Sequence, residues 1–339
     1  MSVTEELRKA TIAQAQGAMA LQLAFIGVAN GLLGEFAKAA DSPPGIAHRL
    51  SLDSGYVTRW CEAAFGFGYL DLREGRYELT ELGRAFLPGE PGTLMPFAVQ
   101  AVLGAHMTER ATALMRTGQR PGESVLAERA TLLPWFGPML EATFGPIFER
   151  EVLPGVAEFA EVAARGGVAL DLGCGNGWYL RRLAARFPAL HGIGLDGFEE
   201  NVRQATERAR EEGLSKQLSF RTGDIDEHTP REPVALVAMN RALHHVWDRR
   251  ERVFHTLHDS LQPGGVAVIW EPAWPSELAR LRDPRARAMA VQNLAEHVQG
   301  NHFLRPAEIE AAFSEGDMPA RTFLFGGGLE AVVVATRTR

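Results

Sequence analysis

The chain has 339 residues, of which 46% are hydrophobic and 23% charged, proportions that are ordinary for a folded globular protein. This length exceeds one typical domain, so we expect two, and the net charge of −7 argues against nucleic acid or an anionic membrane as a partner. The two cysteines, Cys61 and Cys174, lie far apart in the sequence and imply no disulfide framework. The N-terminus lacks a basic stretch followed by a long apolar core. We therefore expect no signal peptide, no membrane span and a cytoplasmic protein.

The first forty residues predict helices. Apolar side chains recur at helical spacing across residues 4–40, and Gly17, Gly31 and Gly34 interrupt the pattern, which indicates two helices rather than one. Their apolar surface suits dimerisation, and packing within one chain is the alternative.

A compact unit follows the break at residues 41–45, which read Asp-Ser-Pro-Pro-Gly. Helices over 46–50 and 54–65 and a hairpin over 69–79 form the pattern of a winged helix-turn-helix. A helix that reads DNA carries basic or amide side chains, whereas residues 53–66 have a net charge of −1. We therefore expect no DNA binding from this unit.

The next segment, residues 93–162, predicts mostly helix. Phe144 and Phe148 recur there near helical spacing, and we expect both to line a substrate pocket, with a plain core between domains as the alternative. The sequence thus predicts three parts: a helical and winged-helix dimerisation domain over 1–92, a helical bridge over 93–162 and a further domain over 163–339.

The most informative segment is residues 168–177, which read Val-Ala-Leu-Asp-Leu-Gly-Cys-Gly-Asn-Gly, an apolar strand that runs into a glycine-rich turn. Gly173, Gly175 and Gly177 let the backbone turn tightly and approach a ligand closely. Asp171 stands at the carboxyl end of the strand, where open α/β sheets place their ligands. The glycine spacing differs from the dinucleotide fingerprint, and no Gly-Lys-Ser/Thr follows as in a P-loop. An acid before the glycines suits a cationic ligand head, such as the amino group of S-adenosylmethionine (SAM), better than a pyrophosphate.

A second apolar strand covers residues 190–195 and ends at Asp196, 19 residues past Gly177. Related nucleotide folds place an acid at this distance to hold ribose hydroxyls. A third strand leads into Asp224 and Ile225, where a carboxylate could meet an adenine amino group.

Two further strands extend the pattern. One covers residues 234–239 and ends at Asn240, and the other covers residues 266–270 after a Pro-Gly-Gly turn. Short strands that alternate with helical stretches predict a parallel, doubly wound sheet. The tail has an apolar run on each side of three glycines at 326–328, which predicts a terminal hairpin.

The order of glycine motif, ribose acid, Gly-Asp and Pro-Gly-Gly strand resembles the class I SAM-dependent methyltransferases over residues 160–339. The resemblance implies a Rossmann-like seven-stranded SAM-binding sheet with an antiparallel last strand, preceded by an all-helical and winged-helix domain. The N-terminal unit resembles the module that precedes plant-type O-methyltransferases, where it builds a dimer and covers the substrate site. We therefore expect a homodimer that takes SAM, releases S-adenosylhomocysteine and acts on a small molecule. The cofactor-binding residues that the resemblance implies are Asp171, Gly173, Gly175, Asn176, Gly177, Asp196, Gly197, Asp224, Ile225 and Asn240.

The fourth strand is followed by Asn-Arg-Ala-Leu-His-His at 240–245, which faces the methyl donor in this fold. Its Leu-His resembles the O-methyltransferase signature, whose histidine acts as a general base, although the usual Leu-His-Asp-Trp is altered here to Leu-His-His-Val-Trp-Asp. Which of His244 and His245 faces the substrate stays open. An imidazole, with an ordinary pKa of about 6.5, suits removal of a hydroxyl proton during methyl transfer.

A second group of candidate residues lies late in the chain. Residues 277–297 predict a charged helix, and a loop follows it. His297, His302 and Arg305 could bind a substrate carboxylate through charge-assisted hydrogen bonds, and a solvated loop is the alternative. The substrate-binding residues that we expect are Phe144, Phe148, Trp270, His297, His302 and Arg305.

A metal site is a further alternative. Some bacterial methyltransferases of similar layout bind iron through histidines in these two regions and C-methylate α-keto acids. The matching positions here are His244 and His297, and imidazole suits iron or zinc. Two histidines alone leave a ligand set incomplete, so we expect no metal and keep this pair as the alternative.

These features favour SAM-dependent O-methylation of a small metabolite with a histidine base. The layout is also similar to the methylthiohydroxybutyrate S-methyltransferases of dimethylsulfoniopropionate synthesis, so S-methylation of a thioether carboxylic acid is an alternative. A thioether carries no proton, and its methylation needs only proximity and desolvation. Iron-dependent C-methylation of an α-keto acid and a SAM-sensing DNA-binding regulator are the remaining alternatives.

Overall fold

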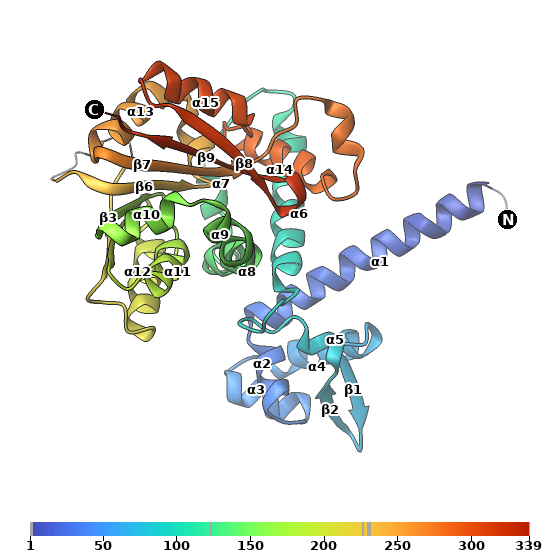
Figure 1. Ribbon diagram of the computed structural model, residues 1–339. Helices are drawn as coiled ribbons and strands as arrows, with labels where there is room; N and C mark the ends of the chain where they lie inside the picture. Colours follow the sequence, from blue (N-terminus) through green and yellow to red (C-terminus); the bar gives the residue numbers. More distant parts are fainter. Residues whose placement is uncertain (1–2, 123, 226, 229–231, 339) are drawn as a thin grey trace. The chain divides into compact units, whose positions relative to one another are not determined.

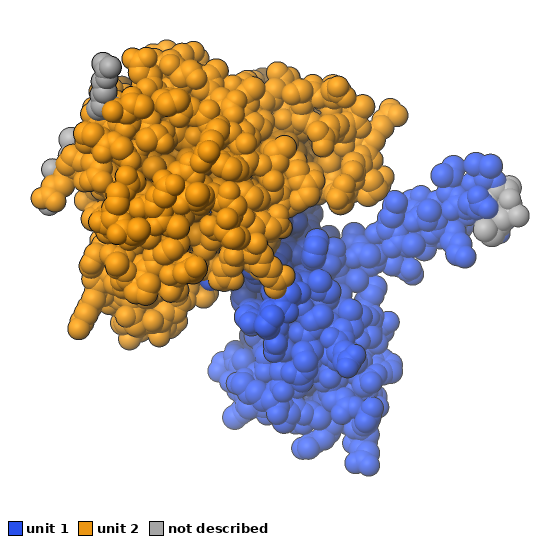
Figure 2. All heavy atoms as spheres, in the orientation of Figure 1, with its two compact units in different colours: residues 1–109, 126–142 blue, residues 110–125, 143–339 orange. Residues whose placement is uncertain are grey.

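Figure 1 shows the computed structural model of the protein, which describes residues 3–122, 124–225, 227–228 and 232–338. The chain forms two compact units (Figure 2), one of residues 1–109 and 126–142 and the other of residues 110–125 and 143–339. The segment predicted as a bridge is therefore shared between the two units.

The first unit begins with helix α1 (Val3–Ala29), which continues through Gly17, and α2 (Leu32–Lys38). Gly31 stands between them with a φ of 71°, a left-handed conformation that glycine adopts at little cost. The prediction of two helices is therefore confirmed, with the break at this one glycine. The predicted winged-helix pattern follows as α3 (Pro43–Leu50), α4 (Ser54–Gly66), β1 (Leu70–Arg73), β2 (Arg76–Leu79) and α5 (Glu81–Arg84).

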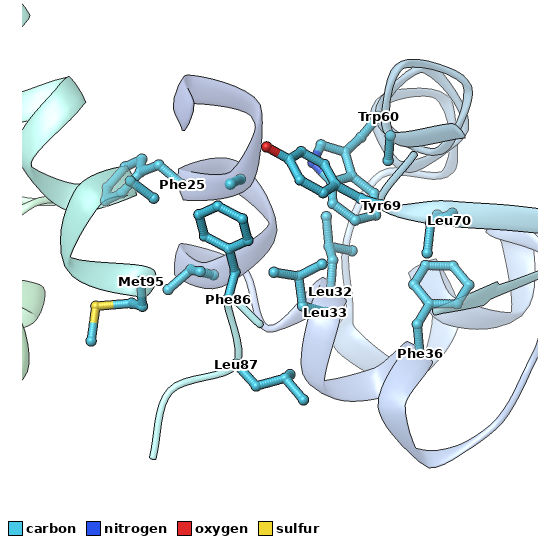
Figure 3. Close-up of a cluster of buried hydrophobic side chains, with 14 of the residues drawn as sticks. Phe25, Leu32, Leu33, Phe36, Trp60, Tyr69, Leu70, Phe86, Leu87 and Met95 are labelled. Carbon is cyan, nitrogen blue, oxygen red and sulfur yellow. The ribbon is translucent and has the colours of Figure 1, made fainter. Parts of the chain in front are cut away.

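A hydrophobic core joins α1 to the winged helix (Figure 3). The Trp60 ring of α4 stacks on Phe36 with the ring centroids 6.2 Å apart, and its Nε1 donates to the Leu23 carbonyl oxygen at 3.1 Å. The Tyr69 hydroxyl donates to the Ala20 carbonyl oxygen at 2.9 Å. These contacts hold only the C-terminal end of α1.

The rest of α1 is largely exposed, although it is apolar. By length and composition alone, α1 could cross a membrane, a feature that the N-terminal sequence pattern did not indicate. Its exposed large apolar side chains are Val3, Leu7, Ile12, Met19 and Ile26.

The segment after the winged helix is helical, as predicted. It comprises α6 (Met95–Leu114), α7 (Ser124–Ala127), a 3-10 turn (Leu133–Trp135), α8 (Phe136–Ile147), a π-helical turn (Phe148–Val152), α9 (Leu153–Gly155) and α10 (Glu158–Arg165).

The second unit contains a seven-stranded sheet in the order β5-β4-β3-β6-β7-β9-β8. The pairs from β5 to β7 are parallel, and β9 is antiparallel to both of its neighbours. The predicted Rossmann-like sheet with an antiparallel last strand is therefore confirmed. Its strands are β3 (Gly167–Leu172), β4 (Leu190–Asp196), β5 (Leu218–Thr222), β6 (Val234–Asn240), β7 (Leu261–Pro272), β8 (Ala320–Phe325) and β9 (Glu330–Thr336).

Helices cover both faces of this sheet (Figure 1), with α13 and α15 on one face and α10, α11 and α12 on the other. The alternation of side chains along each strand supplies an apolar layer to both faces. The remaining elements are α11 (Trp178–Arg186), α12 (Glu199–Glu211), 3-10 helix η3 (Leu243–Arg249), α13 (Arg250–Ser260), 3-10 helix η4 (Leu278–Arg282), α14 (Arg287–Val298), α15 (Pro306–Glu315) and a 3-10 turn (Gly326–Gly328).

The single helix predicted over residues 277–297 is wrong. The segment forms η4 and α14, with a break at Asp283, whose φ of −59° and ψ of 129° are extended. Asp283 precedes Pro284, and the proline ring excludes the residue before it from the helical region.

The glycine turn after β3 is closely packed on one side. Gly173, Gly175 and Gly177 have φ values of 79°, 54° and 74°, all in the left-handed region. A Cβ on Gly177 would lie 2.7 Å from the Phe220 ring and 2.9 Å from the Ala205 Cβ, whereas nothing lies within 4 Å of a Cβ on Gly175. The turn therefore packs against α12 and β5 at Gly177 and stays open at Gly175.

We expect Gly177→Ala to lower the free energy of unfolding by about 2 kcal/mol or more, because left-handed backbone and overpacking each cost a side chain about 1–2 kcal/mol. Urea unfolding followed by circular dichroism measures the loss. The matched control is Gly197→Ala, where an added Cβ meets nothing within 4 Å, and it is expected to cost less than about 0.5 kcal/mol. Equal losses in the two variants would contradict the packing described here.

Candidate functional site

A buried aspartate and a half-buried asparagine meet at the carboxyl ends of the neighbouring strands β3 and β6. The Asn240 Nδ2 donates to the Asp171 Oδ1 at 3.2 Å. The other oxygen of each side chain, Asp171 Oδ2 and Asn240 Oδ1, is buried and has no hydrogen-bond partner among the described residues. Burial raises the pKa of Asp171 to about 8, the hydrogen bond from Asn240 opposes the shift, and the charge of Asp196 adds to it. Two unpaired acceptors in a buried place suit a ligand that donates several hydrogen bonds and carries positive charge.

Asp196 at the end of β4 holds the glycine turn in place. Its Oδ2 accepts from the Gly175 N–H at 2.8 Å, and its Oδ1 accepts from the Phe198 N–H at 3.0 Å and from Asn201 Nδ2 at 2.9 Å. The carboxylate therefore ties the glycine turn to the start of α12. This structural task was not apparent from the sequence spacing, which indicated only a ligand contact.

The remaining predicted cofactor residues differ in exposure. Asn176 is buried, and its Oδ1 accepts from the Trp178 N–H at 3.3 Å. Ile225 lies beside the turn, since its Cδ1 is 3.7 Å from the place of a Cβ on Gly173. The Asp224 side chain is half exposed, with Arg249 at 3.9 Å. The structure thus gathers Asp171, the glycine turn, Asp196, Ile225 and Asn240 at one edge of the sheet.

A buried histidine and carboxylate form the second part of the site. The His244 Nδ1 lies 2.6 Å from the Glu271 Oε2, and the side chains are 3% and 0% exposed. The Glu271 Oε1 accepts from the backbone N–H groups of Leu243 at 2.8 Å and His244 at 3.3 Å. Glu271 thus fixes both the ring and the backbone of His244. With Nδ1 engaged by Glu271, Nε2 is the nitrogen of the His244 ring that remains for another partner.

The charge state of Glu271 follows from its neighbours. Burial alone would raise its pKa, but the charge and hydrogen bond of His244 and the charges of Arg241 and His245 together hold the pKa of Glu271 below its ordinary value. Glu271 is therefore an anion that stabilises positive charge on His244. Glu271 was not among the residues predicted from the sequence, although an acid directly after an apolar strand is the same signal that identified Asp171 and Asp196.

The surroundings of His244 include side chains from a distant part of the sequence. The His245 ring lies with its centroid 4.1 Å from that of His244, and the Phe303 ring meets His244 edge-on at 5.5 Å. The His245 Nδ1 is 2.8 Å from Asn301 Nδ2. The Glu296 Oε2 of α14 lies 3.7 Å from the His244 Nε2.

The predicted substrate-binding residues fall into two groups. Phe144, Phe148 and Trp270 are buried in an aromatic cluster, with ring centroids of Phe144 and Phe148 at 5.9 and 6.1 Å from that of Trp270. His297 and His302 are exposed, and so is Arg305, which is the N-cap residue before α15 and whose N–H donates to the Glu308 side chain. The structure does not bring these two groups together.

Arg241 is a further site residue that the sequence analysis missed. Its guanidinium lies 4.2 Å from the Phe144 ring centroid, and its Nη1 lies 2.7 Å from the Glu330 Oε2. The same Glu330 oxygen accepts from Trp270 Nε1 at 2.8 Å. Arg241 has a φ of 56°, which is strained for a residue with a side chain.

Comparisons with known proteins identify a domain within the second unit. Residues 169–265 match the family model described as "Methyltransferase domain". The glycine turn, Asp196 and the His244 segment all lie within this match. Residues 169–265 form a methyltransferase domain.

Solved structures agree with this assignment. Human N-acetylserotonin methyltransferase, in complex with SAM, superposes with a TM-score of 0.74 and 17% identity over 100% of both chains. An O-methyltransferase family protein from Burkholderia thailandensis gives a TM-score of 0.72 and 16% identity over 100% of this chain and 99% of that one. The fold is that of the plant-type O-methyltransferase arrangement of class I SAM-dependent methyltransferases, so the resemblance drawn from the sequence is confirmed.

Sequence relatives match over a shorter range. The methyltransferase gedG of Aspergillus terreus is 38% identical over 141 residues, which cover 40% of this chain and 38% of the relative. The match thus spans less than half of the relative's length.

We expect Asp171→Asn in the methyltransferase domain to stabilise the free protein at pH 8 while it weakens SAM binding. Because folding raises the pKa of Asp171 from 3.8 to about 8, its contribution to stability is complete below pH 3.8 and is lost as the pH rises through about 8. Asparagine does not titrate, so the stability of the variant relative to the native protein should increase between pH 5 and pH 8. Urea unfolding at the two pH values measures this difference.

The same variant should bind SAM about 30-fold more weakly, because loss of one partner of a buried charge pair costs about 2 kcal/mol or more. Titration calorimetry measures the affinity. Asp248→Asn, at a side chain that is 80% exposed, makes the same chemical change as a control and should alter neither quantity. Unchanged SAM affinity in Asp171→Asn would show that the cofactor does not contact this carboxylate.

Proposed function

We propose that the protein transfers the methyl group of SAM to an oxygen atom of a small metabolite, with His244 as the general base. The observation that carries the proposal is the 2.6 Å contact between the His244 Nδ1 and the fully buried Glu271. A buried anion on one side of an imidazole fixes the ring and stabilises the imidazolium that forms when the other nitrogen takes a proton. The methyltransferase domain and the O-methyltransferase fold support the same reaction.

The chemistry of the unpaired atoms supports the cofactor placement. We assign Asp171 Oδ2 and Asn240 Oδ1 to the amino group of SAM, because both are buried acceptors without partners in the described chain. The open side of the glycine turn at Gly175 gives room for the methionine portion. Asp196 would hold the ribose, and Asp224 with Ile225 the adenine, although the Asp196 oxygens also keep the turn in place.

The proposed reaction uses few protein groups. SAM supplies a methyl group that is already activated on a sulfonium sulfur. The chain must hold the acceptor in line with that methyl group and exclude water, and the burial of His244 and Phe303 serves the second task. As the new C–O bond forms and the C–S bond breaks, His244 Nε2 takes the hydroxyl proton, and Glu271 stabilises the resulting charge. The products are the methyl ether and S-adenosylhomocysteine, and the proton then passes to solvent.

We expect His244→Ala to lower kcat about 100-fold or more, the range typical for loss of a general base, with little change in SAM affinity. Glu271→Gln, which keeps the size of the side chain and removes its charge, should lower kcat about tenfold or more. The assay is methyl transfer from labelled SAM to a panel of phenols, α-keto acids and thioether carboxylic acids.

His255→Ala is the control for this pair, since His255 lies on α13 and is 77% exposed. It should keep full activity. A thioether acid methylated at full rate by His244→Ala would replace the base mechanism with S-methylation by proximity. Loss of activity in the control as well would point to a general effect on folding.

We further propose a cytoplasmic homodimer formed through α1. Ile12, Met19 and Ile26 follow one another at seven-residue spacing, which places them on one stripe of the helix, and all three are exposed. A second copy of this helix is the occupant that such a stripe suits best, because two equal stripes bury each other. This arrangement covers the apolar surface without a membrane.

We expect Met19→Glu to weaken the dimer at least about tenfold, because a carboxylate in an apolar seam is costly to desolvate. Light scattering after size-exclusion chromatography at micromolar concentration measures the molar mass. Gln14→Glu adds the same charge on the opposite side of the helix and should leave the dimer intact. A native protein that is monomeric, or that requires detergent, would contradict the proposal.

A further inference from the structure

Three potential metal ligands converge beside the proposed base. His244, His245 and Glu296 each offer one ligand atom, and these atoms all lie within 4.8 Å of one another. The histidines come from η3 after β6, and Glu296 comes from α14, so the fold brings together segments about fifty residues apart. Two ligands of one transition-metal ion, each about 2.1 Å from it, stand about 3.0–3.5 Å apart. The 3.7 Å between the His244 Nε2 and the Glu296 Oε2 is close to this range.

The surrounding hydrogen bonds orient the two rings for an ion. Metal-bound histidines generally give their second ring N–H to a carboxylate or amide oxygen, which fixes the ring and raises its basicity. Glu271 occupies the Nδ1 side of His244 at 2.6 Å and leaves Nε2 toward Glu296. The Asn301 Nδ2 lies 2.8 Å from the His245 Nδ1, and binding of an ion at Nε2 of that ring requires the amide to turn over, so that its oxygen accepts the Nδ1 proton.

The charge and burial of the cluster also suit a cation. His244 is buried, and the Glu296 side chain is only 17% exposed. The fully buried Glu271 carboxyl group lies 2.6 Å from the His244 Nδ1, on the far side of that ring from Glu296. Two imidazoles and a carboxylate on one side of an ion form a ligand set that suits iron, cobalt or zinc and leaves coordination positions open for a substrate oxygen.

We propose that His244 Nε2, His245 and Glu296 bind one divalent transition-metal ion. The ligand from α14 is Glu296 and not its neighbour His297, because one residue turns a helix by about 100° and His297 is exposed. The ion and a proton compete for the His244 Nε2. A metal-loaded protein therefore cannot use this nitrogen as a base, and saturating metal inhibits base-assisted methyl transfer.

Metal binding to the full-length protein tests the proposal. After treatment with EDTA and its removal, the protein is titrated with Co²⁺ and followed by visible absorption, and bound Zn²⁺ is measured by equilibrium dialysis. We expect one ion per chain. His245→Ala and Glu296→Gln should each weaken binding about tenfold or more, and Glu271→Gln should weaken it about 10–100-fold through the orientation of His244.

The matched control is His297→Ala, which removes a neighbouring histidine from the same helix and should leave the affinity unchanged. Circular dichroism of each metal-free variant confirms folding, and three independent substitutions keep the test valid if one variant does not fold. Binding that disappears in His297→Ala and persists in Glu296→Gln would overturn the proposed ligand set. Less than about a tenth of an equivalent of bound metal at millimolar Co²⁺ would overturn the site, since such a triad binds far more tightly.

The proposal shares His244 with the proposed function, but the two can fail separately. Binding is measured without SAM or an acceptor, so failure to bind metal leaves the base mechanism untouched. Methyl transfer that stops with a chelator and returns with metal would remove the base role and leave the metal site in place. Inhibition by Zn²⁺ in the native protein, together with its absence in Glu296→Gln, is the result expected when both proposals hold.

Discussion

The buried carboxylate of Glu271 is the constraint on which the rest of the site depends. Three hydrogen-bonding groups converge on its two oxygens: the N–H groups of Leu243 and His244 and the His244 ring. The register of the sheet makes this possible, because Asn240 of β6 stands opposite Trp270 of β7, so the chain leaves β6 beside Glu271. A slip by one residue would place an aromatic ring or a proline there and would leave two backbone donors and an imidazole without an acceptor.

The acids at the carboxyl ends of the strands differ in how many hydrogen bonds and ion pairs they form within the protein. This difference indicates which acids are structural and which bind a ligand. Asp196 accepts three hydrogen bonds from the chain and holds the glycine turn. Glu271 is paired with His244 and acts through it. Asp171 has one buried oxygen without a partner in the part of the chain that the structure describes, and burial raises its pKa to about 8, so a cationic partner would relieve both costs. The number of hydrogen bonds that the protein itself gives to a carboxylate therefore distinguishes structural acids from ligand-binding ones better than the position at a strand end does.

The sequence was sufficient for the sheet, the glycine turn and the edge at which the site lies, because each depends on local signals: short apolar strands, left-handed glycines and acids that follow strands. How deeply a side chain is buried, and which side of a helix faces the site, could not be predicted in the same way. Phe148 and Trp270 were expected in a pocket but pack into an aromatic core, since periodicity gives apolar character and not the neighbour that covers it. Glu296 rather than its exposed neighbour His297 lies near His244, on a helix that begins only after the Asp283-Pro284 step has broken the predicted helix.

Arg241 connects the pairing of β6 with β7 to the position of His244. Its N–H donates to the Trp270 carbonyl oxygen at 2.7 Å, which extends the pairing of β6 with β7 by one residue. Its left-handed φ of 56° then turns the chain out of the strand, so that the following N–H groups meet Glu271. The cost of this conformation is offset where the guanidinium lies against Phe144 and Glu330, two groups from distant segments of the same unit. A strained residue held from both its backbone and its side chain is typical of a functional site, and here the strain produces the turn that presents His244.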